Sequence, residues 1–597
     1  MRNFLSRYFI VIPLAAMIGL AVFSHSCANT TQAPTGGPKD TIPPVLLKVN
    51  PLPGKTGVPT HGTKVYFGFN EYVTVKEPKS IYLSPPQAKA PKFRIKGRGI
   101  EVYFEEDLLP NTTYTLDITN AVADNNEGNM FPGFTTVFST GDSVDSLFVT
   151  GTVRDCNSLL PLKGATVMLY KDHSDSAVFL RRPDASIKTD DWGFFCVRNI
   201  QDTLFRLYAI MDANNNNVYD PDEDRIAFLD TAIRPVAVVN DSSPELLKYD
   251  MKDTVHCLAR NSEYNLSVFK ERPSKQMVMN SKRTADRAAY VTFMAPDTRI
   301  DSLWFHGYPA SNVITEFNVR RDSLCLWLND QRRTPDTLKL GLKFWKTDTL
   351  GVLVPVTETL DLVDENRLKN KRERKRIEHA DTVCALNLIA EPTTVEQDGM
   401  RLEFSYPPIF GQFDSLKFWS VNPRQQSKDE KFTIERDSMN LRLYHVKPGV
   451  RLQVGWDYHF KIPERTFRDI NGYWNDSTDV KVSLPTEENL SSLTLNVTGV
   501  NGTRYIVDML DEKRTKVLRS YVIDNDQSLA FPYISAGKYS VRVTEDRNRN
   551  GIVDTGDLLS HRQPEKVIFL DFNKSEYIDI PEKTDIAQDV DFNELFK

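Results

Sequence analysis

Length, composition and charge already narrow the class of protein. The chain has 597 residues, and one hydrophobic core does not grow to that size, so the sequence predicts roughly four or five domains of ~100 to 150 residues. The formal net charge of -6 excludes a global attraction to nucleic acid or to anionic lipid. With 34 Pro, 28 Gly and 10% aromatic residues, the composition favours many short strands over helices, so we expect an all-β fold.

The first residues are typical of an export signal. Arg2 and Arg7 precede an apolar run that is too short to span a membrane. The run is followed by Ser24-His25-Ser26-Cys27, which resembles the lipobox of Bacteroidetes outer-membrane lipoproteins. The resemblance implies cleavage before Cys27 and acylation of its thiol, and more than one acyl chain would give stable anchoring. Ordinary secretion with an incidental Cys is the alternative.

The next segment carries several landmarks of one known domain. Short alternating strands are separated by Pro, Gly and Asn turns, a density that indicates a β-sandwich. The landmarks lie at residues 50–54, 64–71, 108–114, 124–129 and 138–141. In that order they resemble the bacterial Ig-like domain found in surface-layer proteins, and the resemblance covers residues 42–141.

Two further segments are similar to carboxypeptidase-regulatory-like, transthyretin-type β-sandwiches. In residues 147–255 the similarity lies in the segments 149–155, 161–167 and 189–195. Residues 490–597 resemble a second, more diverged copy. Many such domains occur without any peptidase, so the resemblance implies a fold and no activity.

The middle of the chain is less distinctive. Residues 260–363 show strand periodicity without a motif, and residues 382–486 resemble a degenerate copy of the first Ig-like domain. The basic run over residues 367–376 lacks interleaved aromatic residues and follows an export signal, so it favours a solvated linker and no nucleic-acid partner. The predicted order is a signal peptide (1–26), a flexible tether (27–41), an Ig-like domain (42–141), a regulatory-like sandwich (147–255), a β domain of unknown type (260–363), a basic linker (364–381), a degenerate Ig-like domain (382–486) and a second regulatory-like sandwich (490–597).

One loop in each regulatory-like segment has the ligand spacing of a calcium loop. Side-chain oxygens fall at loop positions 1, 3, 5, 9 and 12, and position 7 offers a backbone carbonyl. The expected ligands in the first loop are Asp212, Asn214, Asn216, Val218, Asp220 and Glu223. In the second loop they are Asp546, Asn548, Asn550, Ile552, Asp554 and Asp557.

An alternating apolar run leads into each of these loops, which indicates loops that follow strands and not EF-hands between helices. Gly551 stands at the sharp turn of the second loop, and Asn217 replaces it in the first. Structural calcium is therefore the expected cofactor. The alternative is an Asn/Asp-rich turn that binds nothing, because the same side chains favour turns.

The remaining cysteines give no metal or redox motif, because no pair has the Cys-x-x-Cys spacing. Cys156 and Cys196 fall in one predicted domain, and the sequence leaves open whether they pair in an oxidising periplasm. Because five cysteines remain besides Cys27, at least one of them must stay a free thiol.

No catalytic signature is present in the sequence: it contains no His-Glu-x-x-His, no Gly-x-Ser-x-Gly and no phosphate-binding Gly-rich loop. We therefore expect no enzyme but an outer-membrane lipoprotein that acts as a modular structural and protein-interaction scaffold. The alternative is a dedicated accessory subunit of an outer-membrane machine for barrel assembly, surface lipoprotein export or glycan import. Expected partners are the membrane, through the lipid anchor, and outer-membrane or surface proteins; the sequence leaves the periplasmic and the surface face open.

Overall fold

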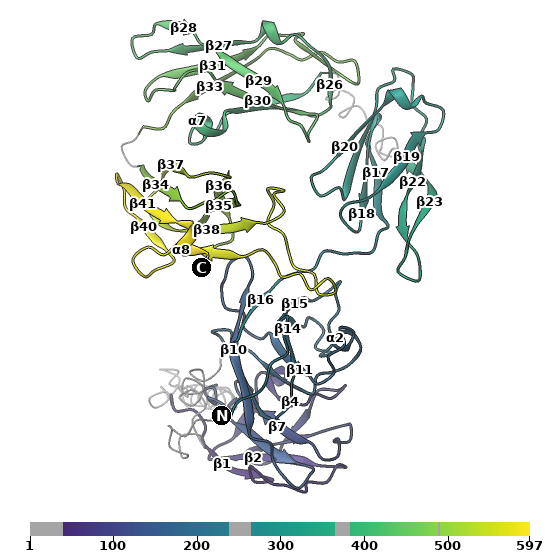
Figure 1. Cartoon of the computed structure of the whole chain (residues 1–597), viewed down its shortest axis with the longest axis vertical. Helices are drawn as coiled ribbons and strands as arrows, with labels where there is room; N and C mark the ends of the chain where they lie inside the picture. The colour runs from purple at the N-terminus through teal and green to yellow at the C-terminus, as the bar shows by residue number, and fades with distance from the viewer. Residues whose placement is uncertain (1–39, 238–263, 364–382, 487–489) are drawn as a thin grey trace, which may run out of the picture. The chain divides into compact units, whose positions relative to one another are not determined.

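The computed structural model describes residues 40–237, 264–363, 383–486 and 490–597 (Figure 1). The predicted signal peptide, Cys27, nearly all of the tether, Cys257 and the basic linker lie outside the described residues. The chain divides into two compact units. The first holds the residues up to Leu83 and Lys89–Val144, and the second holds Ser84–Ala88 and Asp145–Lys597.

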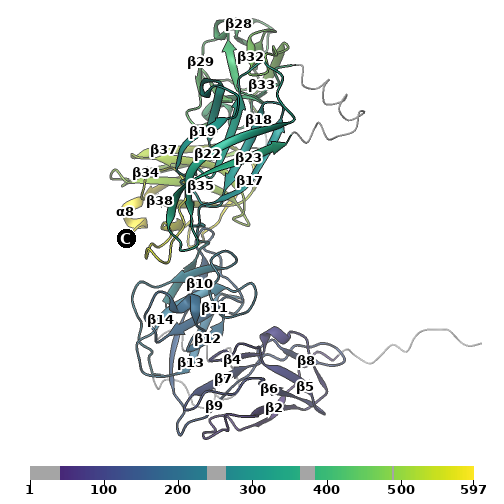
Figure 2. The same cartoon turned by 90° about the vertical axis from the view of Figure 1, so that its right-hand side faces the viewer.

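The first unit is built from three small sheets. Their strand orders are β1-β2-β6-β5, β3-β8 and β4-β7-β9. The strands are β1 (Leu46–Asn50), β2 (Lys64–Phe69), β3 (Val73–Val75), β4 (Tyr82–Ser84), β5 (Lys92–Ile95), β6 (Gly99–Tyr103), β7 (Thr113–Asp117), β8 (Val122–Asp124) and β9 (Thr135–Ser139). Figure 2 shows β2, β6 and β5 side by side.

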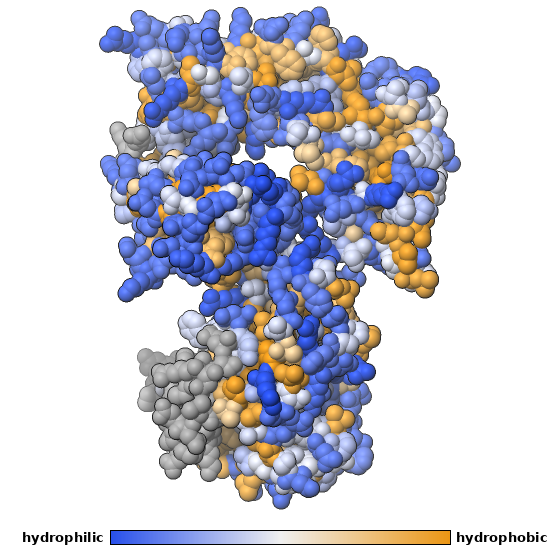
Figure 3. Space-filling view, in the orientation of Figure 1, coloured by the Kyte–Doolittle hydropathy of each residue, from blue (hydrophilic) through white to orange (hydrophobic). Residues whose placement is uncertain are grey.

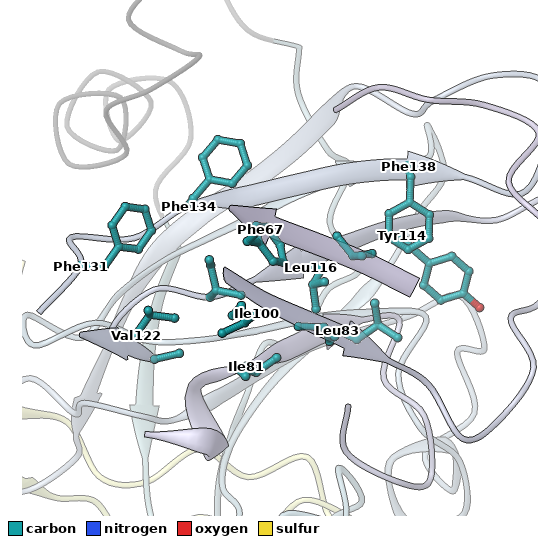
Figure 4. Packing of buried hydrophobic residues seen from close by; sticks show 14 of the residues in the cluster. Phe67, Ile81, Leu83, Ile100, Tyr114, Leu116, Val122, Phe131, Phe134 and Phe138 are labelled. Atoms are coloured by element: carbon teal, nitrogen blue, oxygen red, sulfur yellow. The ribbon is translucent and has the colours of Figure 1, made fainter. Parts of the chain in front are cut away.

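The core of this unit lies between its sheets. Strand side chains alternate between the two faces, so Val65 and Phe67 of β2 point inward with Ile100 of β6. Figure 4 shows Phe67 and Ile100 packed among side chains from the other strands, including Phe138, whose ring stacks on Tyr114 at 5.7 Å between centroids. A period-two pattern with one buried face is what makes these segments strands.

The second sandwich, residues 145–272, has two sheets of order β13-β10-β16 and β12-β11-β14-β15. Its elements are β10 (Leu147–Asp155), β11 (Thr166–Tyr170), α2 (Ala177–Leu180), β12 (Ala185–Lys188), β13 (Phe194–Ile200), β14 (Arg206–Met211), β15 (Arg225–Phe228) and β16 (Tyr264–Val268). Strand β16 pairs with β10 in parallel. The predicted boundary at residue 255 therefore falls short, because this sandwich takes its last strand from residues 264–268.

The last sandwich, residues 490–597, repeats this strand order. Its sheets are β37-β34-β41 and β36-β35-β38-β39, with β40 also paired to β38, and β41 pairs with β34 in parallel. Its elements are β34 (Ser491–Thr498), β35 (Arg504–Asp511), β36 (Val517–Ile523), β37 (Gln527–Ile534), β38 (Gly537–Asp546), β39 (Val567–Phe569), β40 (Ile578–Ile580), β41 (Asp585–Asp591) and α8 (Phe592–Leu595). The two sandwiches thus share one topology.

The third domain forms two sheets, β17-β18-β21-β20 and β19-β22-β23. Its elements are β17 (Val278–Ala285), β18 (Ala288–Phe293), β19 (Ile300–Phe305), η2 (Ala310–Asn312), β20 (Val313–Phe317), β21 (Ser323–Leu328), β22 (Thr337–Thr347) and β23 (Leu353–Val363). The turn of the β22–β23 hairpin exposes Leu350 and Val352, and Figure 3 shows a hydrophobic patch there.

The fourth domain repeats the sheet pattern of the first unit. Its sheets are β24-β25-β30-β29, β26-β32 and β28-β27-β31-β33. In both domains a tyrosine hydroxyl accepts the N–H of the residue five positions earlier: Leu109 to Tyr114 at 2.7 Å and Gln453 to Tyr458 at 2.8 Å. The elements are β24 (Leu386–Ile389), α7 (Val395–Asp398), β25 (Met400–Phe404), β26 (Pro408–Gly411), η3 (Phe413–Ser415), β27 (Lys417–Val421), β28 (Ser427–Asp429), β29 (Phe432–Arg436), β30 (Leu443–Pro448), β31 (Asp457–Ile462), β32 (Phe467–Asp469) and β33 (Thr478–Ser483).

These sheets confirm the all-β fold class predicted from the sequence. Within the described ranges, no helix is long and apolar enough to cross a membrane. The described cysteines are free thiols, so Cys156 and Cys196 do not pair. Each is buried on a different part of its sandwich, Cys156 in a cluster with Phe269 and Cys196 beside Phe148, which keeps the two sulfurs in separate packing environments.

Candidate calcium-binding loops

Each candidate loop begins where a central strand of a sheet ends. Strand β14 is buried along almost its whole length and leads into Asp212, and β38 ends on Asp546, which is 1% exposed. The strands are held by neighbours on both sides, β11 and β15 around β14, and β35 with β39 and β40 around β38. The first ligand position of each loop is therefore fixed by the sheet and not by the loop.

In the first loop, side-chain oxygens organise the backbone. Asp212 accepts the N–H groups of Asn216 at 3.3 Å and Asn217 at 2.9 Å, and Asn216 Oδ1 accepts the N–H of Val218 at 2.7 Å. Asn217 takes a left-handed conformation with φ of 58°, which Asn tolerates better than most residues. The turn therefore forms although the usual Gly is missing.

The second loop repeats this arrangement position by position. Asp546 accepts the N–H groups of Asn550 at 3.1 Å and Gly551 at 2.8 Å, and Asn550 Oδ1 accepts the N–H of Ile552 at 2.8 Å. Gly551 supplies the left-handed residue with φ of 75°. Two loops some 330 residues apart in sequence thus fold by one hydrogen-bond scheme.

The structure brings loop positions 1, 3, 5 and 9 together. In the first loop the side-chain amides of Asn214 and Asn216 donate to Asp220 Oδ2 at 3.0 and 2.9 Å. In the second loop, Asn548 and Asn550 donate in the same way to Asp554. The expected position-7 carbonyls belong to Val218 and Ile552, and their N–H groups are held by position 5.

The structure does not bring position 12 into either group. Glu223 is exposed, and Asp557 accepts the N–H of Ser560 at 2.8 Å. The sequence spacing predicted these two residues as ligands, and that role stays a prediction.

Two buried carboxylates that sequence spacing missed close the loops instead. Asp224 accepts the N–H groups of Ala213 and Asp220, both at 3.0 Å. Glu565 accepts those of Arg547 at 3.0 Å and Asp554 at 2.8 Å. Both carboxylates thus join loop position 2 to loop position 9. Asp224 follows its loop directly, whereas Glu565 lies eleven residues beyond Asp554, where no local pattern could have indicated it.

Several carboxylates lie near each of these closing residues, Asp224 and Glu565. Burial raises the pKa of Asp224 above its ordinary value, and the nearby carboxylates of Asp212 and Asp220 add to the rise. Burial likewise raises the pKa of Glu565, with Asp554 and Asp546 adding to it. A bound cation would relieve this repulsion, because it stabilises the ionised carboxylates.

The donor chemistry of the loops fits calcium. Carboxylate, amide and backbone carbonyl oxygens are the ligands that calcium takes, and it accepts six to eight of them in irregular geometry. Among the residues that the structure describes, no group of three or more His, Cys, Asp or Glu side chains forms a metal cluster, so a site here depends on the Asn amide oxygens. The Asn/Asp turn that binds nothing uses these same hydrogen bonds, and calcium remains a prediction.

A short bridging segment, residues 269–272, contacts both loops. On the first loop, Lys270 Nζ donates to the carbonyl oxygens of Pro221 and Asp224 at 2.9 and 2.8 Å, and Tyr219 donates its hydroxyl to Glu271 at 2.6 Å. On the second loop, Arg272 forms an ion pair with Asp554. Thr555 of that loop donates its hydroxyl to the carbonyl of Lys270 at 2.6 Å.

A segment that follows the second loop, residues 555–564, packs against the second sandwich, and we call it the arm. Leu558 is fully buried in a cluster with Phe228 and Phe269, and its N–H donates to Glu271. Gly556 lies so close to Phe269 that a Cβ there would stand 2.6 Å from the ring. The second and last sandwiches therefore meet through their loops, with an apolar side chain at the centre of the contact.

Comparison with known proteins supports the class indicated by this architecture. Residues 40–140 match the family model of the bacterial Ig-like domain, which confirms the family predicted for residues 42–141. The chain is an all-β protein of several sandwiches, and residues 40–140 are the part that matches the bacterial Ig-like family. The comparison with curated proteins gives no match.

Several solved structures are similar at low identity. The major pilin subunit of Bacillus cereus is 10% identical, with coverage of 75% of this chain and 99% of the pilin and a TM-score of 0.14. The surface-layer protein rSbsC is 12% identical over 84% of this chain and 53% of its own, with a TM-score of 0.13. An L,D-transpeptidase from Mycobacterium smegmatis is 16% identical over 38% of this chain and 90% of its own, with a TM-score of 0.13. Scores this low carry no argument about activity or domain arrangement.

Proposed function

We propose that the chain is a non-catalytic lipoprotein, anchored at the outer membrane through Cys27, that acts as a modular structural and protein-interaction scaffold. The proposal is supported by the bacterial Ig-like family match and by the repeated sandwich topology. The described thiols also favour a structural role. Burial raises the pKa of both Cys156 and Cys384 to about 12, so neither is a ready nucleophile at neutral pH.

The observation that carries the proposal is the way in which the loops are used. Both candidate calcium loops face the same bridging segment, and Leu558 of the arm completes the core of another sandwich. A loop that must be rigid to hold two sandwiches together is a structural element. Its fixed shape matters more than access to solvent or substrate.

We propose calcium as the structural cofactor of both loops. Asp212, Asn214, Asn216 and Asp220 would hold it in the first loop, and Asp546, Asn548, Asn550 and Asp554 in the second. Bound calcium would supply positive charge against Asp224 or Glu565 and fix the turn. An ion that binds only the folded form stabilises it by mass action, by ~2.7 kcal/mol at a hundredfold excess over the dissociation constant.

Titration calorimetry on a truncated chain that lacks residues 1–27, and with them the lipid anchor, tests the calcium proposal. Asp220→Ala and Asp554→Ala should each remove one binding event, whereas Glu223→Ala, at an exposed side chain, should leave both. No heat from wild-type protein at calcium concentrations of about 1 mM, the range of extracellular modules, would leave the loops as Asn/Asp turns.

Membrane fractionation tests the anchor. Cys27→Ser should move the protein from the membrane to the soluble fraction, and continued membrane attachment of this variant would contradict lipidation. A mild-detergent pull-down from native membranes then separates the scaffold from the alternative. One stoichiometric barrel partner would indicate an accessory subunit of an outer-membrane machine.

A further inference from the structure

The outer face of the first unit's four-stranded sheet gathers positive charge. The inner face of sheet β1-β2-β6-β5 carries the core residues seen in Figure 4, among them Phe67 and Ile100. Residues paired across an antiparallel sheet share a face, so the register defines what the opposite face carries. That face points away from the unit's own core.

The register places basic side chains of three strands, β1, β2 and β5, on this one face. Lys64 of β2 and Lys92 of β5 both pair with Tyr103 of β6. One step along, Arg94 pairs with Glu101, which also faces Tyr66. A further step along β2, Gly68 pairs with Lys48 of β1. The outer face is therefore lined by Lys48, Lys64, Lys92, Arg94 and, just past the end of β5, Lys96.

Few carboxylates oppose these cations. Glu101 is 5% exposed and lies among three of them, 4.0 Å from Lys64 Nζ, 3.0 Å from Lys96 Nζ and in an ion pair with Arg94. The hydrogen bond from Lys96 contributes most to holding the pKa of Glu101 below its ordinary value, although burial acts against it. At the edge of the face, Glu105 pairs with Lys92 and Lys89. The face keeps a positive surplus in a chain whose net charge is -6.

The basic side chains of this face are accessible to solvent, and tyrosines lie among them. About half or more of each Lys64, Lys92, Arg94 and Lys96 side chain is exposed. Half-buried tyrosines, Tyr66 and Tyr103, lie between them. A flat basic surface with tyrosine rings suits the interface of a bilayer, where lysine and arginine meet phosphate and tyrosine meets the headgroup level.

We propose that this basic face, defined by Lys48, Lys64, Lys92, Arg94 and Lys96, docks the first unit on an anionic lipid surface. The inference rests on the proposed anchor at Cys27. Twelve residues separate Cys27 from Asp40, and the thirteen Cα–Cα steps between the two residues span roughly 45 Å at full extension, which keeps the unit near the bilayer. Proximity is needed because salt screens exposed charges beyond about 8 Å at physiological ionic strength.

Vesicle binding by the truncated chain that lacks residues 1–27 tests the proposal without relying on the anchor. The chain should bind vesicles that contain about one third phosphatidylglycerol, more weakly as salt rises, and should not bind pure phosphatidylcholine. The triple variant Lys48→Gln, Lys64→Gln, Lys96→Gln leaves Arg94 paired with Glu101. It should bind at least tenfold more weakly, because each basic residue near an anionic surface contributes about fivefold.

A matched triple variant on the same unit serves as the control. Lys55→Gln, Lys76→Gln and Lys79→Gln remove the same charge from exposed positions outside this sheet and should leave vesicle binding unchanged. Equal losses in both triples, or no binding of the wild type to anionic vesicles, would overturn the proposal. Binding to an acidic polysaccharide but not to vesicles would do so too and would assign the face to a glycan. Loss of membrane attachment in Cys27→Ser cells is a separate result, so failure of the anchor and failure of the face are distinguishable.

Discussion

The two candidate calcium loops share a hydrogen-bond scheme but differ in how they are closed. Asp224 closes the first loop from the next residue past position 12, whereas Glu565 closes the second after the ten-residue arm. Both carboxylates reach the same two backbone N–H groups. The closing carboxylate is therefore defined by its position in space, and residues inserted before it in the sequence are free to take a second role. In the second loop that role is contact with another sandwich.

A substitution in the arm, Leu558→Ala, should give the largest loss of stability. Leu558→Ala removes a fully buried side chain from the cluster around Phe269, and such substitutions cost about 2 to 5 kcal/mol. We expect hydrogen exchange of arm and first-loop amides to accelerate accordingly in the truncated chain that lacks residues 1–27. Leu559→Ala is the control, because Leu559 is 68% exposed, and it should change stability by less than ~0.5 kcal/mol. Equal exchange in both variants would mean that the arm does not hold the sandwiches together.

Substitution of the closing carboxylates, Asp224 and Glu565, should give the second largest loss of stability. Asp224→Asn and Glu565→Gln each replace one acceptor oxygen by an amide that cannot accept an N–H, which costs about 1 to 3 kcal/mol for a buried group. Denaturant or thermal unfolding of the sandwich that carries the substitution would register the loss. Glu223→Gln, at the exposed position that spacing favoured, should be neutral. A larger effect at Glu223 than at Asp224 would reverse our assignment of the closing residue.

The left-handed turn residue also differs between the two loops. Gly551→Ala places a Cβ in open space but in a left-handed conformation, at a cost of roughly 1 to 2 kcal/mol. Asn217→Gly should stabilise the first loop slightly or leave it unchanged, because Gly reaches that conformation without strain. Melting temperatures with and without calcium measure both changes. Destabilisation by Asn217→Gly would show that the Asn217 side chain has a further role.

A pH dependence of opposite sign with and without calcium is the smallest expected effect. Burial raises the pKa of Asp224 and Glu565, so their protonated forms favour the folded loops. That contribution is present below their ordinary pKa values of 3.8 and 4.5, and is lost as pH rises through the raised folded values. Calcium needs ionised ligands, so its stabilising increment should grow over the same rise in pH. Melting curves of metal-free and calcium-loaded protein between pH 4 and pH 7.5 would check both trends, and parallel trends would contradict calcium binding.

Much of the fold could be predicted because the information is local. The alternation in β2 and β38 is legible within a few residues, and the spacing of Asp546, Asn548, Asn550 and Asp554 indicated side chains that the structure does bring together. Local spacing also describes the left-handed turn. A hydrogen-bond scheme within five residues is set by backbone geometry that the sequence carries directly.

The remainder depends on partners that are distant in sequence. Glu565 reaches its loop only because β38 and β39 are neighbours, and β16 joins β10 across more than one hundred residues. The pairing of Cys156 with Cys196 was open for the same reason, since sequence does not say that the two thiols belong to different clusters. The ligand role of position 12, expected from the loop spacing, stays a prediction.

The strand order of the two sandwiches has a mechanical consequence. The first and last strands of each are neighbours and run parallel, β10 with β16 and β34 with β41. A pulling force that enters at the start of β10 and leaves at the end of β16 acts at opposite ends of that shared edge. It loads the hydrogen bonds between the two strands in shear, so they resist together and do not unzip one by one. The seven-residue pairing of β34 with β41 gives the last sandwich the same resistance to a force applied at its two ends.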